Sequence, residues 1–314
     1  MRVLRPVIGL LVSGVALWIV AGQVDLETTG DILATAAPVW VAAMLAAFVL
    51  DVLLRARRWQ LLLAPIRALP YVTVLASVFV GYLANNVLPA RLGEVVRSSH
   101  LGGRTGVGVT TALGTVVVER AVDTAMVVGI AGVAVLSLGV SGPVASAVTV
   151  GLFVVAVLTA GIALAIAAHR LPGAATVVGR AARWTLVSTL VGRLRHGLAV
   201  AGRPRTLAMA VALSAAAWAM SALAFACAAT ALGVAVGPAE AALFATGVAL
   251  ATAVPAGPGY VGTFELAGVA VGAALGIGAP EALAVTVLAH VGILAFTSLG
   301  GAIALARTGW SRSA

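Results

Sequence analysis

Two short polar clusters interrupt an otherwise apolar chain, and both contain residue types suited to binding an anion. The first, NNVLPARLGEVVR, runs from 85 to 97, and the second, PAGPGYVGTFE, runs from 255 to 265. Each reads proline, glycine and then glutamate, the pattern of a helix that ends, a backbone that turns and a second helix that begins with a carboxylate. Free backbone amides at such a break attract phosphate. We therefore expect a candidate anion site at these two breaks.

Ionisable residues are costly within apolar spans, so those present are expected to be paired, to face a cavity and to be functional. Glu119 and Asp123 are four residues apart and share a helix face, with Arg120 on an adjoining side. Such carboxylates can exchange protons or balance a lipid phosphate, or they form a structural ion pair with Arg91 or Arg97. The candidate substrate-binding residues are Asn85, Asn86, Arg91, Glu94, Arg97, Glu119, Arg120, Asp123, Pro255, Gly259, Gly262, Glu265 and His290, and the secondary candidates are Asp51, Arg55, Arg58 and Trp59.

Three of these candidates also have purely structural interpretations. Glu94 and Glu265 follow helix breaks, where a carboxylate stabilises the positive end of the helix dipole. His290 is a single histidine within an apolar stretch, where a hydrogen-bonded packing role is common. The sequence leaves these alternatives open.

Signatures of common enzyme classes are absent from the sequence. It contains no serine-hydrolase elbow, no HExxH zinc motif, no phosphate loop with lysine and no Asp-x-Asp metal motif. All 19 basic residues are arginine, which excludes lysine Schiff-base chemistry, and the single Cys227 excludes an intrachain disulfide and a cysteine metal site. We expect a non-enzyme with no catalytic residues, no metal and no cofactor.

The composition indicates the elements that position these residues. The chain of 314 residues is 62% hydrophobic and 9% charged, which is typical of an integral membrane protein. A membrane-spanning helix needs about 20 apolar residues. The runs that reach this length predict six full spans at 4–23, 36–54, 106–138, 144–168, 206–232 and 281–306.

Two further segments, 71–104 and 239–277, are too long for one span, and each carries its break near the middle. Arginine-rich sequence flanks the first on both sides, whereas the acidic loop at 25–31 has no arginine. By the positive-inside rule, the first segment enters and leaves from the cytoplasm, the second does so from outside, and both termini are cytoplasmic. We expect two oppositely oriented re-entrant hairpins, an inverted-repeat-like arrangement used by transporters. The alternative, two full helices with polar turns, would place Arg91, Arg97 and Arg104 outside.

The rest of the chain predicts a single membrane domain over 1–314. Its first apolar stretch follows two arginines as a signal peptide does, but without a cleavage site it is expected to be retained as a span. The segment 169–205 has the spacing of a basic amphipathic helix on the cytoplasmic leaflet, with a solvated linker as the alternative.

Four motifs in this order resemble one known family: RARRWQLLL (55–63), NNVLPARLGEVVR (85–97), ERAVD (119–123) and PAGPGYVGTFE (255–265). They resemble the transmembrane region of lysylphosphatidylglycerol synthases, flippase-like proteins related to the N-terminal half of the multiple peptide resistance factor. The resemblance implies lipid translocation. The motif residues that it carries over are Arg55, Arg58, Trp59, Asn86, Pro89, Gly93, Glu94, Arg97, Glu119, Arg120, Asp123, Pro255, Gly259, Gly262 and Glu265.

The chain also departs from this family pattern. The second tip reads GPGYVG where many relatives have a Pro-Gly-Gly core, and His290 stands where an arginine is frequent, so a different substrate is expected. An aminoacyl-transfer domain like that of the synthases is not found, so lipid synthesis is not expected.

These observations together predict an all-α integral protein of the bacterial cytoplasmic (inner) membrane. The expected function is a flippase that moves an anionic or aminoacylated phospholipid, or a glycolipid, with its head group between the two tips. The alternative is a lipid-binding accessory subunit of a glycosyltransferase or lipid synthase. Expected partners are membrane lipids, a second copy of the chain or a lipid-synthesis protein, and nucleic acid is not expected.

Overall fold

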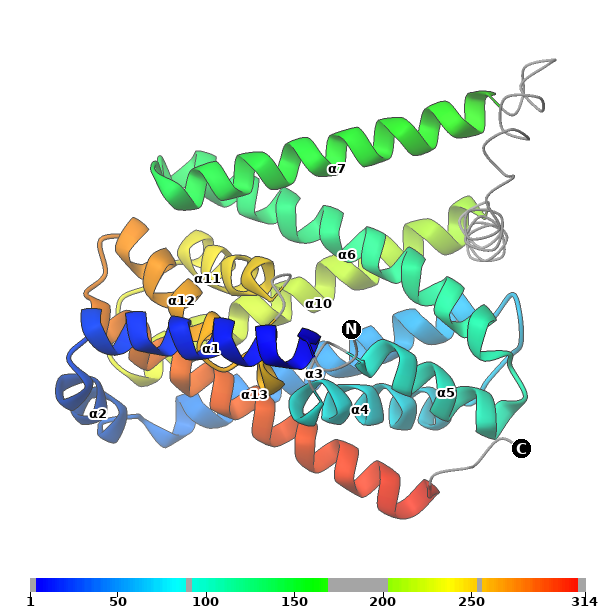
Figure 1. Ribbon diagram of the computed structural model, residues 1–314, viewed down its shortest axis with the longest axis horizontal. Coiled ribbons are helices and arrows are strands. Elements are labelled where there is room, and N and C mark those ends of the chain that lie inside the picture. Colours follow the sequence, from blue (N-terminus) through cyan, green and yellow to red (C-terminus); the bar gives the residue numbers. More distant parts are fainter. Residues whose placement is uncertain (1–3, 89–91, 169–202, 253–255, 310–314) are drawn as a thin grey trace.

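The computed structural model describes residues 4–88, 92–168, 203–252 and 256–309, most of which are helical (Figure 1). The helices are α1 (Leu4–Gln23), α2 (Leu26–Ala34), α3 (Pro38–Leu63), α4 (Tyr71–Val87), α5 (Gly93–Thr105), α6 (Val109–Leu138), α7 (Pro143–Ala168), α10 (Pro204–Ala231), α11 (Pro238–Ala251), the short 3-10 helix η1 (Pro258–Tyr260), α12 (Thr263–Ala274) and α13 (Ala279–Thr308). The described residues form no strand, which confirms the all-α class.

Four of the described helices are long and apolar enough to cross a membrane: α3, α6, α10 and α13. They confirm four of the six expected spans to within a few residues, except that α3 continues to Leu63. The expected spans at 4–23 and 144–168 are present as helices α1 and α7. However, α1 meets the length and hydropathy criteria only together with α2, and the two are bent by 88°. The chain is a multi-pass membrane protein.

The acidic segment that was expected to be a loop is instead the helix α2. Asp25 precedes this helix and accepts hydrogen bonds from the backbone amides of Glu27 and Thr28, at 3.0 and 3.1 Å. A side-chain acceptor of this kind satisfies amides that lack a partner in the first turn. The prediction of a loop overlooked this capping signal.

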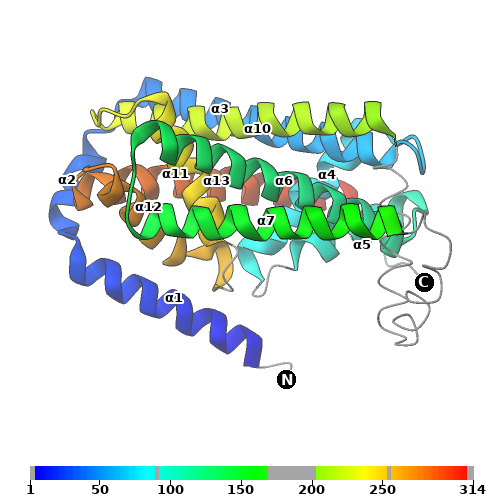
Figure 2. The ribbon, with the colours of Figure 1, turned by 90° about the horizontal axis from the view of Figure 1, so that it is seen from above.

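Helices α3 and α10 run antiparallel and form one face of the molecule, opposite α1 (Figure 2). The amide of Ala37, just before α3, donates to the carbonyl of Ala231, the last residue of α10, at 2.8 Å. Because α3 begins where α10 ends, polar residues along α3 face polar residues along α10. This pair carries much of the site described below.

The first broken segment folds back on itself as α4 and α5, which pack directly against each other. The contact depends on two glycines, because a Cβ added at Gly93 would lie 2.3 Å from the carbonyl oxygen of Gly81. The second segment does the same as α11 and α12, with η1 between them. The α4–α5 hairpin lies toward one end of the molecule and the α11–α12 hairpin toward the other (Figure 1).

Helix α13 supports both hairpins along its length. Its N-terminal half packs against α12, where a Cβ added at Gly268 would lie 1.9 Å from the Thr286 hydroxyl. Its C-terminal half packs against α4, where a Cβ added at Gly301 would lie 2.7 Å from the carbonyl oxygen of Phe79. The two breaks therefore meet beside the middle of α13.

Helix α6 packs against α5 and α11, and α7 packs on α6 at the outer side of the molecule (Figure 1). The expected amphipathic helix at 169–205 lies almost wholly outside the described residues, which resume at Arg203.

Candidate functional site

A cavity of about 240 Å³ lies where the two hairpins meet α3, α6, α10 and α13. Asn85, Asn86 and Glu94 line it from the first hairpin, and Thr252 and Tyr260 line it from the second. A Cβ added at Gly259 would lie 3.7 Å from the backbone oxygen of Asn86, so the two tips are in contact. The polar breaks that the sequence singled out thus share one cavity.

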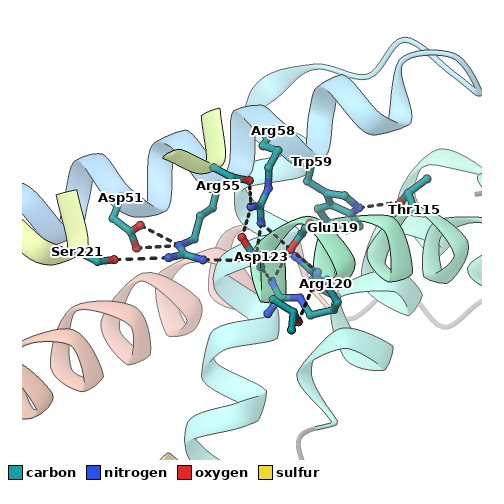
Figure 3. A network of polar contacts seen from close by, with 12 residues as sticks. Asp51, Arg55, Arg58, Trp59, Thr115, Glu119, Arg120, Asp123 and Ser221 are labelled. Atoms are coloured by element: carbon teal, nitrogen blue, oxygen red, sulfur yellow. Dashed lines mark hydrogen bonds and ion pairs between the residues drawn. The ribbon is translucent and has the colours of Figure 1, made fainter. Parts of the chain in front are cut away.

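Glu119 is the centre of a buried ion-pair cluster beside this cavity (Figure 3). Its Oε1 accepts from the Nη2 atoms of Arg97 at 3.0 Å and Arg120 at 2.6 Å, and it lies 3.2 Å from Nη2 of Arg58. Its Oε2 has no hydrogen-bond partner among the described residues. Three guanidinium groups therefore converge on a single carboxylate oxygen.

Asp123, one turn further along α6, links Arg55 to the arginines that contact Glu119. Arg58 donates to both of its oxygens, with Nη2 at 2.9 Å from Oδ2, and Arg120 contacts the same Oδ2 at 2.9 Å. Nη1 of Arg55 lies 3.6 Å from Oδ2, while its Nε donates to both oxygens of Asp51, at 2.9 and 3.0 Å. Together with Arg97, the charged side chains labelled in Figure 3 form one continuous network.

The cluster carries more positive than negative charge. It joins the four arginines Arg55, Arg58, Arg97 and Arg120 to the three carboxylates Asp51, Glu119 and Asp123. Arginine stays protonated in proteins, so the excess cannot be removed by losing a proton. The excess lies at the cavity, where the Arg120 side chain is 43% exposed and the carboxylate of Glu94 also lines the wall, and an anionic ligand there would supply a further counter-charge.

Two tryptophans hold the arginines in place by stacking. The Arg97 guanidinium lies 4.6 Å from the ring centre of Trp59, whose Nε1 donates to Thr115 at 3.0 Å. The Arg55 guanidinium lies 4.7 Å from the ring centre of Trp218 on α10. Such cation–π contacts orient the arginine planes without using their N–H donors.

Side-chain amides stabilise the first tip. Oδ1 of Asn85 accepts from the amide of Gly93 at 2.7 Å, which closes the α4–α5 break. Nδ2 of Asn86 donates to the hydroxyls of Thr297 and Ser298 on α13, both at 2.9 Å. The two asparagines thus fix the tip to itself and to α13.

A carboxylate and a histidine stabilise the second tip. Gly262 has φ of 93°, and its amide donates to Oε2 of Glu265 at 2.6 Å. Oε1 of Glu265 contacts Nδ1 of His290, and Nε2 of His290 contacts the carbonyl oxygen of Gly259 at 2.8 Å. A carbonyl only accepts, so the contact with Gly259 assigns the donor role to Nε2. Both ring nitrogens of His290 are thus held by oxygen atoms of the second tip.

The structure brings most of the sequence candidates together. Arg97, Glu119, Arg120 and Asp123 lie in the ion-pair cluster, whereas Glu265, His290, Gly259 and Gly262 lie together at the second tip. Glu94 lines the cavity in the first turn of α5 and makes no ion pair with a described residue. Arg91 and Pro255, like Pro89, lie outside the described residues.

The sequence interpretation gave too little weight to two helices. Arg58 was ranked as secondary, yet its side chain is fully buried at the centre of the cluster. Ser214, Trp218 and Ser221 on α10 were missed, although Ser214 accepts a hydrogen bond from Arg58 at 2.5 Å and Trp218 and Ser221 line the cavity. Their spacing of four and three residues places them on one face of an apolar helix, a signal that could have identified them.

Comparison with known proteins gives a partial relative and a family. A glycosyltransferase of Haloferax volcanii, named AglD, is 30% identical over 140 residues, which cover 43% of this chain. The matched part is 22% of that protein, so the chain spans only a small share of its length. The family described as "Lysylphosphatidylglycerol synthase TM region" matches residues 7–301 and so includes both tips and the whole ion-pair cluster. The chain belongs to the lysylphosphatidylglycerol synthase transmembrane-region family.

Proposed function

We propose that the protein moves a phospholipid between the two leaflets, with the lipid phosphate bound in the cavity between the hairpin tips. The observation that carries this proposal is the excess positive charge of the cluster, presented to the cavity by Arg97 and Arg120. Each arginine donates from its Nη2 to Oε1 of Glu119, and its Nη1 makes no hydrogen bond to a described residue. Guanidinium groups with free N–H donors are well suited to phosphate oxygens.

In this proposal the carboxylate of Glu119 pairs with Arg97 and Arg120 when no lipid phosphate is bound. A phosphate at Arg97 and Arg120 competes with Oε1 of Glu119, while Arg58 and Asp123 keep the rest of the network together. Glu94 and Glu265 lie on opposite tips, where they gate the cavity or take up protons. Arg91 would add to the phosphate site.

The transport mechanism would follow the design of opposed broken helices. Half-helices that meet near the membrane midplane tolerate irregular backbone because it lines a cavity, and moving one hairpin against the other exposes that cavity to alternate sides. The two hairpins in contact at Asn86 and Gly259 support this arrangement. The proposed topology has both hairpins re-entrant, between six full spans.

Charge at the two ends of the helices supports a specific orientation. Arg67, Arg104, Arg205 and Arg307 lie at the end where α3, α5 and α13 finish and α10 begins. Asp25, Glu27, Asp31, Glu240 and Glu281 lie at the other end. By the positive-inside rule the arginine end is cytoplasmic, in a bacterial inner membrane with both termini inside.

Reconstitution into liposomes tests the proposed activity directly. Fluorescent phosphatidylglycerol should exchange between leaflets faster than in protein-free liposomes, and Arg97→Ala and Arg120→Ala should slow it at least tenfold. The matched control is Arg104→Ala, because Arg104 lies on the same helix as Arg97 but contacts the carbonyl of Thr308, away from the cavity. Lipid movement at the protein-free rate across phosphatidylglycerol, phosphatidylethanolamine and phosphatidylcholine would contradict the proposal.

A second candidate is a lipid-binding accessory part of a glycosyltransferase or lipid synthase. It is favoured by the similarity to a protein named as a glycosyltransferase. The same cavity would then present a lipid to a partner without moving it. Retention of lipid by the purified protein, together with no acceleration in liposomes and co-purification of a synthetic enzyme, would favour this role over transport.

A further inference from the structure

Two polar groups of the first tip face the cavity and have no partner. Glu94 lines the cavity and makes no ion pair with a described residue, and Nδ2 of Asn85 makes no hydrogen bond to one. Nε1 of Trp218 is enclosed by protein, whereas these two groups are open to the cavity. An amide nitrogen donates and an ionised carboxylate only accepts. A ligand that meets both groups must therefore accept and donate.

The fold places these two groups side by side. Oδ1 of Asn85 accepts from the amide of Gly93 at 2.7 Å, and Gly93 immediately precedes Glu94. The approach is tight, because a Cβ added at Gly93 would lie 2.5 Å from Oδ1 of Asn85. Since this bond uses Oδ1, the Nδ2 donor of the same amide is what remains for a ligand.

The pair lies beside the proposed phosphate site. Glu94 and Arg97 are three residues apart on α5, and both line the cavity. Glu94 also interacts electrostatically with Arg120. The hydroxyl of Tyr82 on α4 makes no hydrogen bond to a described residue and lies within electrostatic reach of both arginines, where it adds an uncharged donor. A phosphate held by the two arginines therefore places the next atoms of its head group at Glu94 and Asn85.

The chemistry of the pair favours a hydroxyl over an ammonium group. A hydroxyl can donate to the Glu94 carboxylate and accept from the Asn85 amide, so it satisfies both groups at once. An ammonium offers no acceptor to Asn85, and it would lie near the guanidinium groups of Arg97 and Arg120, where like charges repel. Adjacent hydroxyls, as in glycerol or a sugar ring, would let each carboxylate oxygen accept one hydrogen bond.

We propose that Glu94 and Asn85 bind the hydroxyls of a polyol head group, glycerol or a sugar, whose phosphodiester is held by Arg97 and Arg120. This inference rests on the proposed function and narrows its substrate class to lipids with hydroxyl-bearing head groups. The cavity volume of about 240 Å³ lies below the range of roughly 300–1,000 Å³ typical of pockets that enclose a drug-sized ligand. This volume suits a phosphate and a small polyol, while the acyl chains extend into the membrane.

The test compares two anionic lipids that differ only in the hydroxyls of the head group. Purified full-length protein in detergent is incubated with equal amounts of phosphatidylglycerol and phosphatidylpropanol with the same acyl chains, and the retained lipids are measured by mass spectrometry. The wild type should retain phosphatidylglycerol about tenfold more, the effect of one hydrogen bond to a charged group. Glu94→Leu, which keeps an apolar side chain of similar size but no acceptor, should retain the two lipids equally.

The readout is a ratio within each sample, so partial loss of folded protein does not alter it. Glu240→Leu is the matched control, because Glu240 also lies in the first turn of a helix, α11, but does not line the cavity. It should keep the wild-type ratio. Arg120→Ala should weaken retention of both anionic lipids and leave their ratio unchanged.

Two further lipids separate the possible head groups. Phosphatidylinositol replaces phosphatidylglycerol in a parallel sample, and the better retained of the two shows whether the site takes a ring polyol or glycerol. A preference for phosphatidylethanolamine over both that Glu94→Leu removes would identify an ammonium site and overturn the inference. Equal retention of phosphatidylpropanol and both polyol lipids by the wild type, or an unchanged preference in Glu94→Leu, would also overturn it. Because retention does not require transport, absence of lipid movement in liposomes with a preserved polyol preference would overturn transport alone.

Discussion

His290 and Thr297 lie seven residues apart on the same face of α13, and each contacts one of the two hairpin tips. His290 contacts Glu265 and the carbonyl of Gly259 at the second tip, whereas Thr297 accepts a hydrogen bond from Asn86 at the first. Seven residues are two helical turns, or about 10 Å along the axis. One rigid helix therefore sets the spacing of the two tips, and a tip that moves must first exchange its contacts with α13.

The second tip should lose local order when Glu265 is replaced by alanine. The substitution removes both the acceptor of the Gly262 amide and the partner of His290. Amide hydrogen exchange measured by mass spectrometry should become about tenfold faster in the peptide that contains Gly262, because local opening no longer breaks these bonds. Glu281→Ala, in the first turn of α13, is the control and should leave this peptide unchanged. Equal protection in Glu265→Ala and wild type would show that Glu265 does not hold the tip.

The stability of the buried cluster should depend strongly on Arg58. Its side chain is fully buried and joins Glu119 to Asp123, so Arg58→Ala removes a buried ion pair with each of them at once. Removing one partner of a buried ion pair typically costs about 3–5 kcal/mol. Thermal unfolding in detergent, followed by tryptophan fluorescence, should show a correspondingly large loss. Arg57→Ala, next to it on the exposed side of α3, should change stability by less than about 0.5 kcal/mol. Similar losses for both variants would contradict this assignment.

Hydrophobic length and local breaks made much of the fold predictable. The apolar runs gave α3, α6, α10 and α13, and the pattern of proline, glycine and glutamate gave both hairpins, because these signals act over neighbouring residues. The 88° bend between α1 and α2 was not predictable from hydropathy, since it depends on Asp25 as a helix cap and on packing against α12 and α13.

The sequence could identify the charged residues of the site but not which of them form ion pairs. Buried charge marked Arg97, Glu119 and Asp123 as candidates, yet sequence spacing could not show that three arginines share one oxygen of Glu119. That pairing arises because α3 and α5 bring Arg58 and Arg97 to the same oxygen on α6. Trp218 was missed for the same reason, because its importance comes from Arg55 on a different helix.

Close packing of α1 against the second tip should make Gly262 intolerant of a side chain. Its φ of 93° is a conformation that L-residues avoid, and a Cβ there would lie 2.5 Å from the carbonyl oxygen of Ser13. Gly262→Ala should therefore destabilise the protein by more than about 2 kcal/mol in the same thermal assay. Gly14→Ala, on α1 with open space around it, should be neutral or slightly stabilising. A neutral result at Gly262 would show that α1 does not pack on this tip in the membrane.

The proposed orientation can be mapped by cysteine labelling. Cys227 is buried, so a Cys227→Ser background gives a chain without reactive thiols. In intact cells, a membrane-impermeant maleimide should label Glu240→Cys, at the acidic end, and should not label Arg307→Cys, at the arginine end, until the membrane is permeabilised. The opposite pattern would reverse the orientation while leaving the fold intact. A re-entrant α11–α12 hairpin followed by a full α13 span requires an odd number of membrane crossings between residues 240 and 307. Labelling of both sites in intact cells would contradict this topology.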